Sequence, residues 1–175
     1  MAGNDFLVFI GAYTQRDGRG IGLARFDANT GALSTPELAA EIANPSFVAL
    51  DPSLSHLYAV TEIDDYDGNV SGALSSFDVD RSSGALTFLN RQPTNGPGPC
   101  HVGVDASGQN AIVANYAGGS VAVLPIGTDG SLSAPSDFVQ HEGGTRVFPE
   151  RQDGPHAHSA NLDLETGRGY INDLG

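Results

Sequence analysis

The hydrophobic residues of the chain fall in short runs rather than in long amphipathic stripes. The runs are rich in Val, Ile, Phe and Tyr, and each is bounded by Gly, Asp, Asn or Pro. No window of about a dozen residues repeats apolar positions at the 3.6-residue period of a helix. Such runs predict β-strands separated by tight turns. We expect strands at 6–13, 21–27, 47–50, 57–61, 74–79, 86–90, 102–104, 111–114 and 121–126.

The strand pattern also repeats along the chain. Three segments begin with a proline, carry a short apolar run and end in an aspartate: 45–51, 99–105 and 155–163. Each aspartate is followed by a turn and a second apolar run. Hairpin turns of similar sequence recur at 30–33, 83–86 and 129–132. Four strands in roughly 50 residues are typical of one blade of a β-propeller.

We therefore expect an all-β chain that forms about three and a half four-stranded blades. The run at 6–13 would close the inner pair of a first, partial blade, and 169–174 would be the second strand of the last one. Closed propellers have four to eight blades, and folded proteins normally avoid open sheet edges. Residues 1–175 are accordingly predicted to be a partial β-propeller, the N-terminal half of a single propeller domain.

The composition narrows the range of partners. The net charge is −13 and all eight basic residues are arginines, so a nucleic-acid partner, which requires a basic surface, is not expected. The same charge disfavours anionic membranes, and no apolar run approaches the roughly 18 residues of a transmembrane helix. No targeting signal is recognisable, so we expect a cytoplasmic protein. The single cysteine, Cys100, excludes an internal disulfide and is interpreted as a small buried residue.

The most informative local motif is Gly154-Pro155-His156-Ala157-His158-Ser159, just before a strand-like run at 160–163. Residues two apart in a strand share a face, so His156 and His158 would project together if the backbone is extended. Histidine titrates near neutral pH, which favours an acid/base or ligand role over that of polar residues in a loop. A zinc site with Asp173 or Glu62 is an alternative, although no third histidine has local ligand spacing.

The blade repeat gathers further polar residues around this motif. The first two strands of a blade are antiparallel neighbours, so the start of the first and the end of the second lie at the same face of the propeller. We therefore expect one polar mouth that includes these residues: Glu62, His101, Asn115, Tyr116, His156, His158 and Asp173. A pocket lined by histidines, carboxylates and amides is a reasonable candidate site.

An ordered set of motifs gives the chain a family resemblance. The motifs lie at 11–14, 57–62, 99–102, 113–116, 140–143, 155–159 and 173–175. Together they resemble the seven-bladed propeller lactonases, which include 6-phosphogluconolactonase and carboxymuconate-lactonising enzymes. The resemblance implies a site at one mouth of the central channel, a sugar-lactone substrate, and no metal or organic cofactor.

The resemblance also implies roles for single residues. In the lactonising members a histidine sits five residues before the aspartate that ends the inner strand, which is His158 here. We expect His158 to act as general base or proton shuttle, and His101 to donate a hydrogen bond to substrate or oxyanion. The expected substrate-binding residues are Glu62, Asn115, Arg151, His156 and Asp173. The family's arginine, in a His-Pro-Arg-type motif, and its glutamate belong to later blades, outside this chain.

Two other functions remain open at this level. Propellers often bind without catalysis, and the same site could serve a cycloisomerase acting on a muconate-like acid. The predicted partial propeller also exposes sheet faces and edges, which favours self-association or pairing with a C-terminal half.

Overall fold

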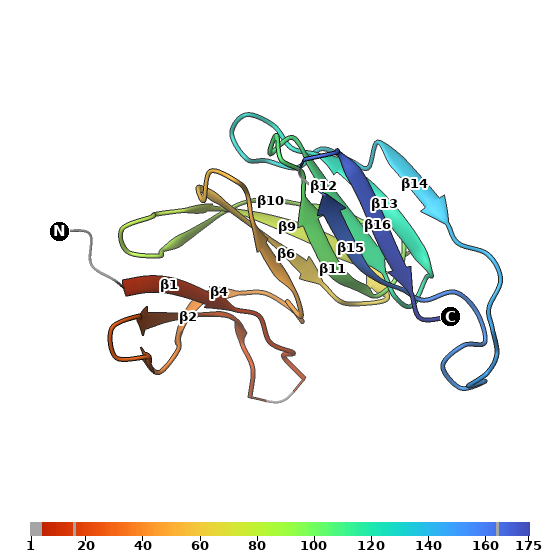
Figure 1. Ribbon diagram of the computed structural model, residues 1–175, viewed down its shortest axis with the longest axis horizontal. Helices are drawn as coiled ribbons and strands as arrows, with labels where there is room; N and C mark the ends of the chain where they lie inside the picture. The colour runs from red at the N-terminus through yellow and green to blue at the C-terminus, as the bar shows by residue number, and fades with distance from the viewer. Residues whose placement is uncertain (1–4, 16, 164) are drawn as a thin grey trace.

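The computed structural model describes residues 5–15, 17–163 and 165–175; Met1–Asn4, Arg16 and Leu164 lie outside the described part. Within it the secondary structure is entirely β, so the predicted fold class is confirmed (Figure 1). No helix that could cross a membrane is found among these residues. The strands are β1 (Asp5–Ile10), β2 (Gly20–Asp27), β3 (Ala32–Leu33), β4 (Glu37–Glu41), β5 (Val48–Leu50), β6 (His56–Thr61), β7 (Asp65–Tyr66), β8 (Asn69–Val70), β9 (Ala73–Val79), β10 (Leu86–Pro93), β11 (Pro99–Val104), β12 (Asn110–Asn115), β13 (Ser120–Pro125), β14 (Asp137–Gln140), β15 (Ala157–Asp163) and β16 (Arg168–Asp173).

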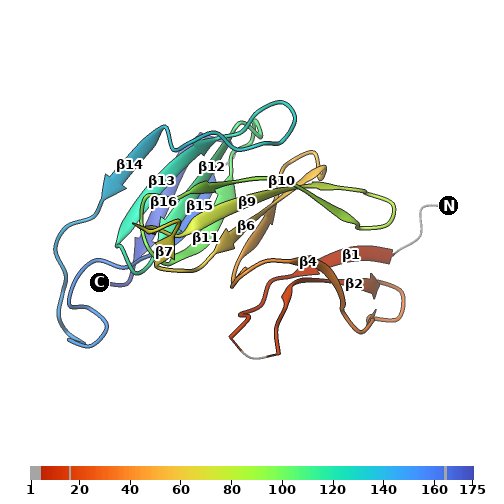
Figure 2. The same cartoon turned by 180° about the vertical axis from the view of Figure 1, so that it is seen from behind.

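The strands form four successive antiparallel sheets, which we number as blades 1 to 4. In blade 1, β1 pairs with β2, and β2 pairs with both β3 and β4. Blade 2 has the order β5-β6-β9-β10 and blade 3 the order β11-β12-β13-β14, while blade 4 consists of β15 and β16. A small hairpin, β7–β8, is inserted between β6 and β9. The sheets follow one another from the N-terminal to the C-terminal end of the molecule (Figure 2).

The strand boundaries differ from the expected ones in a few places. The first strand ends at Ile10 rather than residue 13, because the chain at Gly11 passes against the carbonyl of Pro45. A Cβ at Gly11 would lie 2.0 Å from that oxygen, so only glycine fits this close approach. The last inner strand, β15, begins at Ala157 and therefore includes His158. Strands β3, β4, β7, β8 and β14 were not expected, because each spans only two to five residues and none forms a long apolar run.

The hydrophobic core lies between the blades rather than within any one of them. Tyr58 and Val60 of blade 2 pack against Val102, Val113 and Leu124 of blade 3 in one buried cluster. A second cluster joins blade 1 to blade 2, and a third joins blade 3 to blade 4. Central strands are thus buried on both faces, and they appear in the sequence as continuous apolar runs rather than as alternating patterns.

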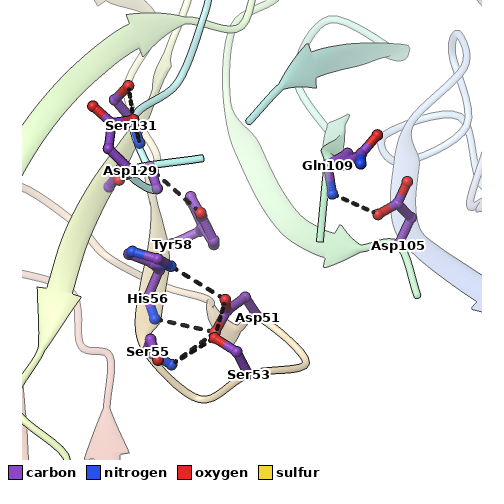
Figure 3. Close-up of polar contacts among 11 residues, drawn as sticks. Asp51, Ser53, Ser55, His56, Tyr58, Asp105, Gln109, Asp129 and Ser131 are labelled. Carbon is purple, nitrogen blue, oxygen red and sulfur yellow. Dashed lines mark hydrogen bonds and ion pairs between the residues drawn. The ribbon is translucent and has the colours of Figure 1, made fainter. Parts of the chain in front are cut away.

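The repeated aspartates fix the turns that follow the inner strands. The Asp51 carboxylate accepts hydrogen bonds from the backbone N–H groups of Ser55 (2.9 Å) and His56 (3.1 Å) and from the Ser53 hydroxyl (2.6 Å) (Figure 3). Asp105 accepts equivalent bonds from its own turn, including 2.9 Å from the N–H of Gln109. Burial alone would raise the pKa of Asp51, but these hydrogen bonds lower it below its ordinary value.

A turn of blade 3 is attached directly to blade 2. The carbonyl of Gly130 accepts hydrogen bonds from the hydroxyls of Tyr58 (3.2 Å) and Ser76 (2.6 Å). Burial and the nearby carboxylates of Asp51 and Asp129 raise the pKa of Tyr58, so this hydroxyl remains a donor. Gly130 has φ +78°, and a Cβ there would lie 2.1 Å from the His56 ring. Glycine is therefore needed for backbone conformation and for space.

We expect Gly130→Ala to destabilise the chain more than Gly31→Ala, the matched change in the corresponding turn of blade 1. Both glycines have positive φ, which costs a non-glycine residue roughly 1–2 kcal/mol. A Cβ at Gly31 meets no atom within 4 Å, whereas one at Gly130 displaces His56 from the blade interface. Urea denaturation of the two variants measures the difference. Equal losses in the free energy of unfolding would contradict this account of the turn.

Candidate active site

The starts of the inner strands and the ends of their neighbours meet at one face, as the blade repeat predicts. Pro99 pairs with Asn115 in blade 3, and Ala157 pairs with Asp173 in blade 4. The pairing register shifts at the next residue of each inner strand, so Cys100 and His158 occupy β-bulges. Bulges re-aim side chains and are frequent beside functional sites. This face is called the mouth below.

The two histidines of the central motif meet at one aromatic ring. His156 stacks on Tyr116, with ring centroids 4.6 Å apart and an angle of 18° between the planes. His158 meets the same ring edge to face, at 5.6 Å and 83°. The His158 side chain is exposed, and its carbonyl accepts a hydrogen bond from the Cys100 thiol at 3.4 Å. A solvent-accessible imidazole on a bulge is suited to proton transfer with water.

His156 is held by two hydrogen-bond acceptors. Its Nδ1 lies 3.0 Å from the carbonyl oxygen of Tyr116, and its Nε2 lies 3.3 Å from a carboxylate oxygen of Asp153. The ring can donate to both only when both of its nitrogens carry a proton. Arg151 from the same loop donates to the Tyr116 hydroxyl at 3.3 Å. A guanidinium and an imidazole therefore flank one tyrosine ring.

His101 is held between three blades in a defined tautomer. Its ring packs against that of Phe47 of blade 2, with centroids 4.0 Å apart and an angle of 32° between the planes. Its Nδ1 accepts a hydrogen bond from the backbone N–H of Ala160 in blade 4 at 3.2 Å, so the proton of the neutral ring is on Nε2. Burial, and to a smaller extent the charge of His158, lower the pKa of His101. At neutral pH His101 is therefore a neutral donor through Nε2.

Glu62 is already engaged by neighbouring side chains. The Tyr13 hydroxyl lies 3.0 and 2.9 Å from its two carboxylate oxygens, and the Ser46 hydroxyl donates to one of them. Burial, followed by the nearby Glu62 charge, raises the pKa of the Cys100 thiol to about 11. The thiol is thus protonated at neutral pH. Cys100 is half-buried, whereas a buried residue was expected.

The side chain of Asn115 lies inside blade 3, although its backbone pairs with Pro99 at the mouth. Its side chain is fully buried, and its Nδ2 donates to the carbonyl of Thr94 (3.3 Å) and to the hydroxyl of Ser120 (3.1 Å). Its Oδ1 is buried without a hydrogen-bond partner among the described residues. The structure therefore does not bring Asn115 together with the histidines, because the end of β12 is covered on both faces.

Asp173 holds the backbone at the start of β15, the last inner strand. One carboxylate oxygen accepts from the N–H groups of His156 (2.7 Å) and Gly175 (2.8 Å), and the other lies 2.5 Å from Nδ1 of His141. Partial burial would raise the pKa of Asp173, but the hydrogen bonds from His141 and from these two N–H groups lower it. His141 was not among the expected site residues, because it follows an outer strand and has no counterpart in the repeat. Its position in the family motif at 140–143 was the available signal.

Cavities lie at both ends of the blades. One of about 390 Å³ lies beside the His141–Asp173 pair and is also lined by Thr145 and Pro155. Another, of about 680 Å³, lies among the turns of Asp51 at the opposite end, where the polar side chains serve the turn hydrogen bonds. In the described part of the chain, no three His, Cys, Asp or Glu side chains are grouped as metal ligands. The groups that the mouth offers for chemistry are the imidazoles of His101, His156 and His158 and the guanidinium of Arg151.

Comparison with known proteins places the chain in a family. Residues 7–175 match the model described as "Lactonase, 7-bladed beta-propeller". The chain is 38% identical over 170 residues to a 6-phosphogluconolactonase of Bacillus subtilis, covering 97% of this chain and 47% of that protein. It is 29% identical over 169 residues to a 6-phosphogluconolactonase of Formosa agariphila, covering 96% of this chain and 47% of that protein.

Solved structures agree with this result. A candidate 6-phosphogluconolactonase from Bacteroides fragilis superposes with a TM-score of 0.89 at 34% identity, covering 98% of this chain and 46% of that one. A periplasmic gluconolactonase of Pseudomonas aeruginosa superposes with a TM-score of 0.87 at 31% identity, covering 98% and 48%. The fold is that of a β-propeller, and the chain belongs to the seven-bladed β-propeller lactonase family. It spans about half the length of the relatives that it matches.

The state of His101 predicts how stability depends on pH. Because folding lowers the pKa of His101 below its ordinary value of 6.5, the unfolded chain takes up a proton at a higher pH than the folded chain. The contribution of neutral His101 to the stability of the folded chain is fully present above pH 6.5. It is lost as the pH falls through the lower pKa that His101 has in the folded chain. His101→Phe keeps a ring beside Phe47 and should reduce the loss of stability between about pH 7.5 and about pH 5.5. Urea denaturation at the two pH values measures this, and an unchanged loss would contradict it.

Proposed function

We propose that the chain supplies the His158 side of a lactonase active site that hydrolyses a sugar lactone. The observation that carries the proposal is the neighbouring placement of an exposed histidine, His158, and a neutral donor, His101, in a chain of the lactonase family. His101 accepts a hydrogen bond from the N–H of Ala160, two residues after His158, and the thiol of Cys100 donates to the His158 carbonyl. The names of the relatives from Bacillus subtilis and Formosa agariphila favour 6-phosphogluconolactone as the substrate. Its product would be 6-phosphogluconate.

The proposed reaction adds water across the cyclic ester. The water oxygen bonds to the carbonyl carbon while His158 takes its proton as general base. Negative charge then develops on the carbonyl oxygen, where the Nε2–H of His101 donates a hydrogen bond. The bond between that carbon and the ring oxygen breaks, and the proton held by His158 passes to the ring oxygen.

Binding of the substrate is assigned to the flanking residues. Arg151 and His156 are the cationic or donor groups beside the histidine motif, and a guanidinium suits the phosphate of a phosphorylated lactone. Glu62 and Asp173 are proposed to act mainly by orienting their neighbours, because their oxygens already accept hydrogen bonds. Asn115 supports the mouth from inside its blade.

We further propose that residues 1–175 are the N-terminal half of one seven-bladed domain. The share of each relative that the chain covers, about half, supports this division. On this proposal the family's arginine and glutamate would be supplied by later blades, and a chain without them would be inactive. The expected cytoplasmic location stays a prediction.

Replacing His158 tests the general base. In a protein that carries this chain within a complete propeller, we expect His158→Ala to lower kcat for lactone hydrolysis by about 100-fold or more, with a smaller effect on the binding of a lactone analogue. His56→Asn is the matched control, because His56 pairs with Asp51 in a turn at the opposite end of the blade. It should lower the melting temperature and leave kcat unchanged. A normal kcat in His158→Ala would show that another group acts as the general base.

The 175-residue chain by itself should self-associate and fail to hydrolyse the lactone. Large apolar side chains are exposed at its surface: Phe6 at 58%, Phe148 at 68% and Tyr170 at 54%. Exposed apolar surface and open strand edges favour association. Size-exclusion chromatography with light scattering, together with a lactone hydrolysis assay, measures both properties. A monodisperse, active monomer would contradict the proposed division of the domain.

A further inference from the structure

Tyr116 occupies a special position in the blade repeat. It directly follows β12, as Glu62 directly follows β6, while Asp173 ends β16. Each of these residues reaches across to a neighbouring blade or loop: Glu62 to Tyr13, Asp173 to His141, and Tyr116 to His156. Tyr116 differs from the two carboxylates because it presents a ring face as well as polar atoms.

The backbone of Tyr116 is held on both sides. Its N–H donates to the carbonyl of Gly98 at 2.7 Å, and its carbonyl accepts from the N–H of Gly119 at 3.2 Å as well as from His156. These bonds tie the residue to a tight turn of blade 3. The ring is therefore carried by a rigid part of the blade, whereas the histidines belong to the start of blade 4.

Three side chains of the mouth meet on this one residue. His156 lies flat against its face, His158 meets it edge to face, and Arg151 donates to its hydroxyl. Aromatic pairs with centroids between about 4.5 and 7 Å are attractive in these two arrangements. For the His158 ring, no hydrogen bond is found within the described part of the chain, so the contact with Tyr116 is what limits its rotation.

We propose that Tyr116 is the positioning residue of the mouth, which fixes the imidazoles of His156 and His158 and anchors Arg151 through its hydroxyl. This inference rests on the proposed function. The ring and the hydroxyl have separable roles. The ring orients the imidazole of His158, which transfers the proton. The hydroxyl positions the guanidinium of Arg151, which binds the phosphate of a phosphorylated lactone. Tyr116 itself does not exchange a proton with the substrate.

The first test needs no enzymatic activity. In NMR spectra of a protein that carries this chain within a complete propeller, with its histidines and tyrosines isotopically labelled, the ring protons of His156 should be shifted upfield by the ring current of Tyr116. NOEs should connect Tyr116 to both histidine rings. Tyr116→Phe should keep these features and Tyr116→Leu should abolish them, while Tyr170→Leu, which changes an exposed tyrosine on β16, should leave them unchanged. Absence of the NOEs in the wild-type chain would overturn the proposal, whether or not Tyr116→Leu folds.

The second test separates the two tasks by kinetics in a protein with the complete propeller. Tyr116→Leu should lower kcat by at least about tenfold, because misplacement of a catalytic group by about 1 Å can cost 100-fold. Tyr116→Phe should keep kcat within about twofold but raise KM several-fold for the phosphorylated lactone, and not for gluconolactone. A residue with only a structural role would not produce this split.

The outcomes distinguish this inference from the proposed function. If the wild-type protein hydrolyses no lactone, the proposed function fails, while the NMR spectra still decide whether Tyr116 positions the two rings. If the wild-type protein is active and Tyr116→Leu retains full kcat with both histidines displaced, the positioning role is overturned. Equal changes in KM for both lactones in Tyr116→Phe would overturn the assignment of Arg151 to the hydroxyl.

Discussion

The packing of successive sheets against one another is the constraint on which the rest of this structure depends. In the part of the chain that the structure describes, each cluster of buried side chains joins one sheet to the next. Each strand must therefore be placed by its neighbours in two directions, within the sheet and between sheets. The buried hydroxyls of Tyr58 and Ser76, which bind the carbonyl of Gly130, add directional contacts to this apolar packing.

The same packing creates the mouth. Because the first two strands of a blade run antiparallel, the start of one and the end of the other arrive at a single face. Side chains at that face then meet across blade boundaries, as Tyr13 meets Glu62 and His141 meets Asp173. The bulges at Cys100 and His158 interrupt the strand pairing and re-aim side chains at the point where chemistry is proposed.

The carboxylates of the mouth are engaged by hydrogen bonds from neighbouring groups. Glu62 and Asp173 each accept several hydrogen bonds, and the pKa of Asp173 is lowered as a result. Burial keeps His101 neutral, whereas His158 is exposed to solvent. Two histidines in different environments suit a reaction that requires one proton acceptor and one neutral donor.

The sequence by itself determined the longer strands, the turns that follow the inner strands and the blade repeat, because these depend on local residue types. The apolar runs, the turn glycines and the spacing of Asp51, Asp105 and Asp163 are all visible in one dimension. The motif around His156 and His158 was visible for the same reason. Only the tertiary structure decided which polar residues share the mouth. The burial of Asn115, the engagement of Glu62 by Tyr13 and the arrival of His141 at Asp173 depend on packing around and between blades. Such contacts join residues far apart in the chain, and no local pattern encodes them.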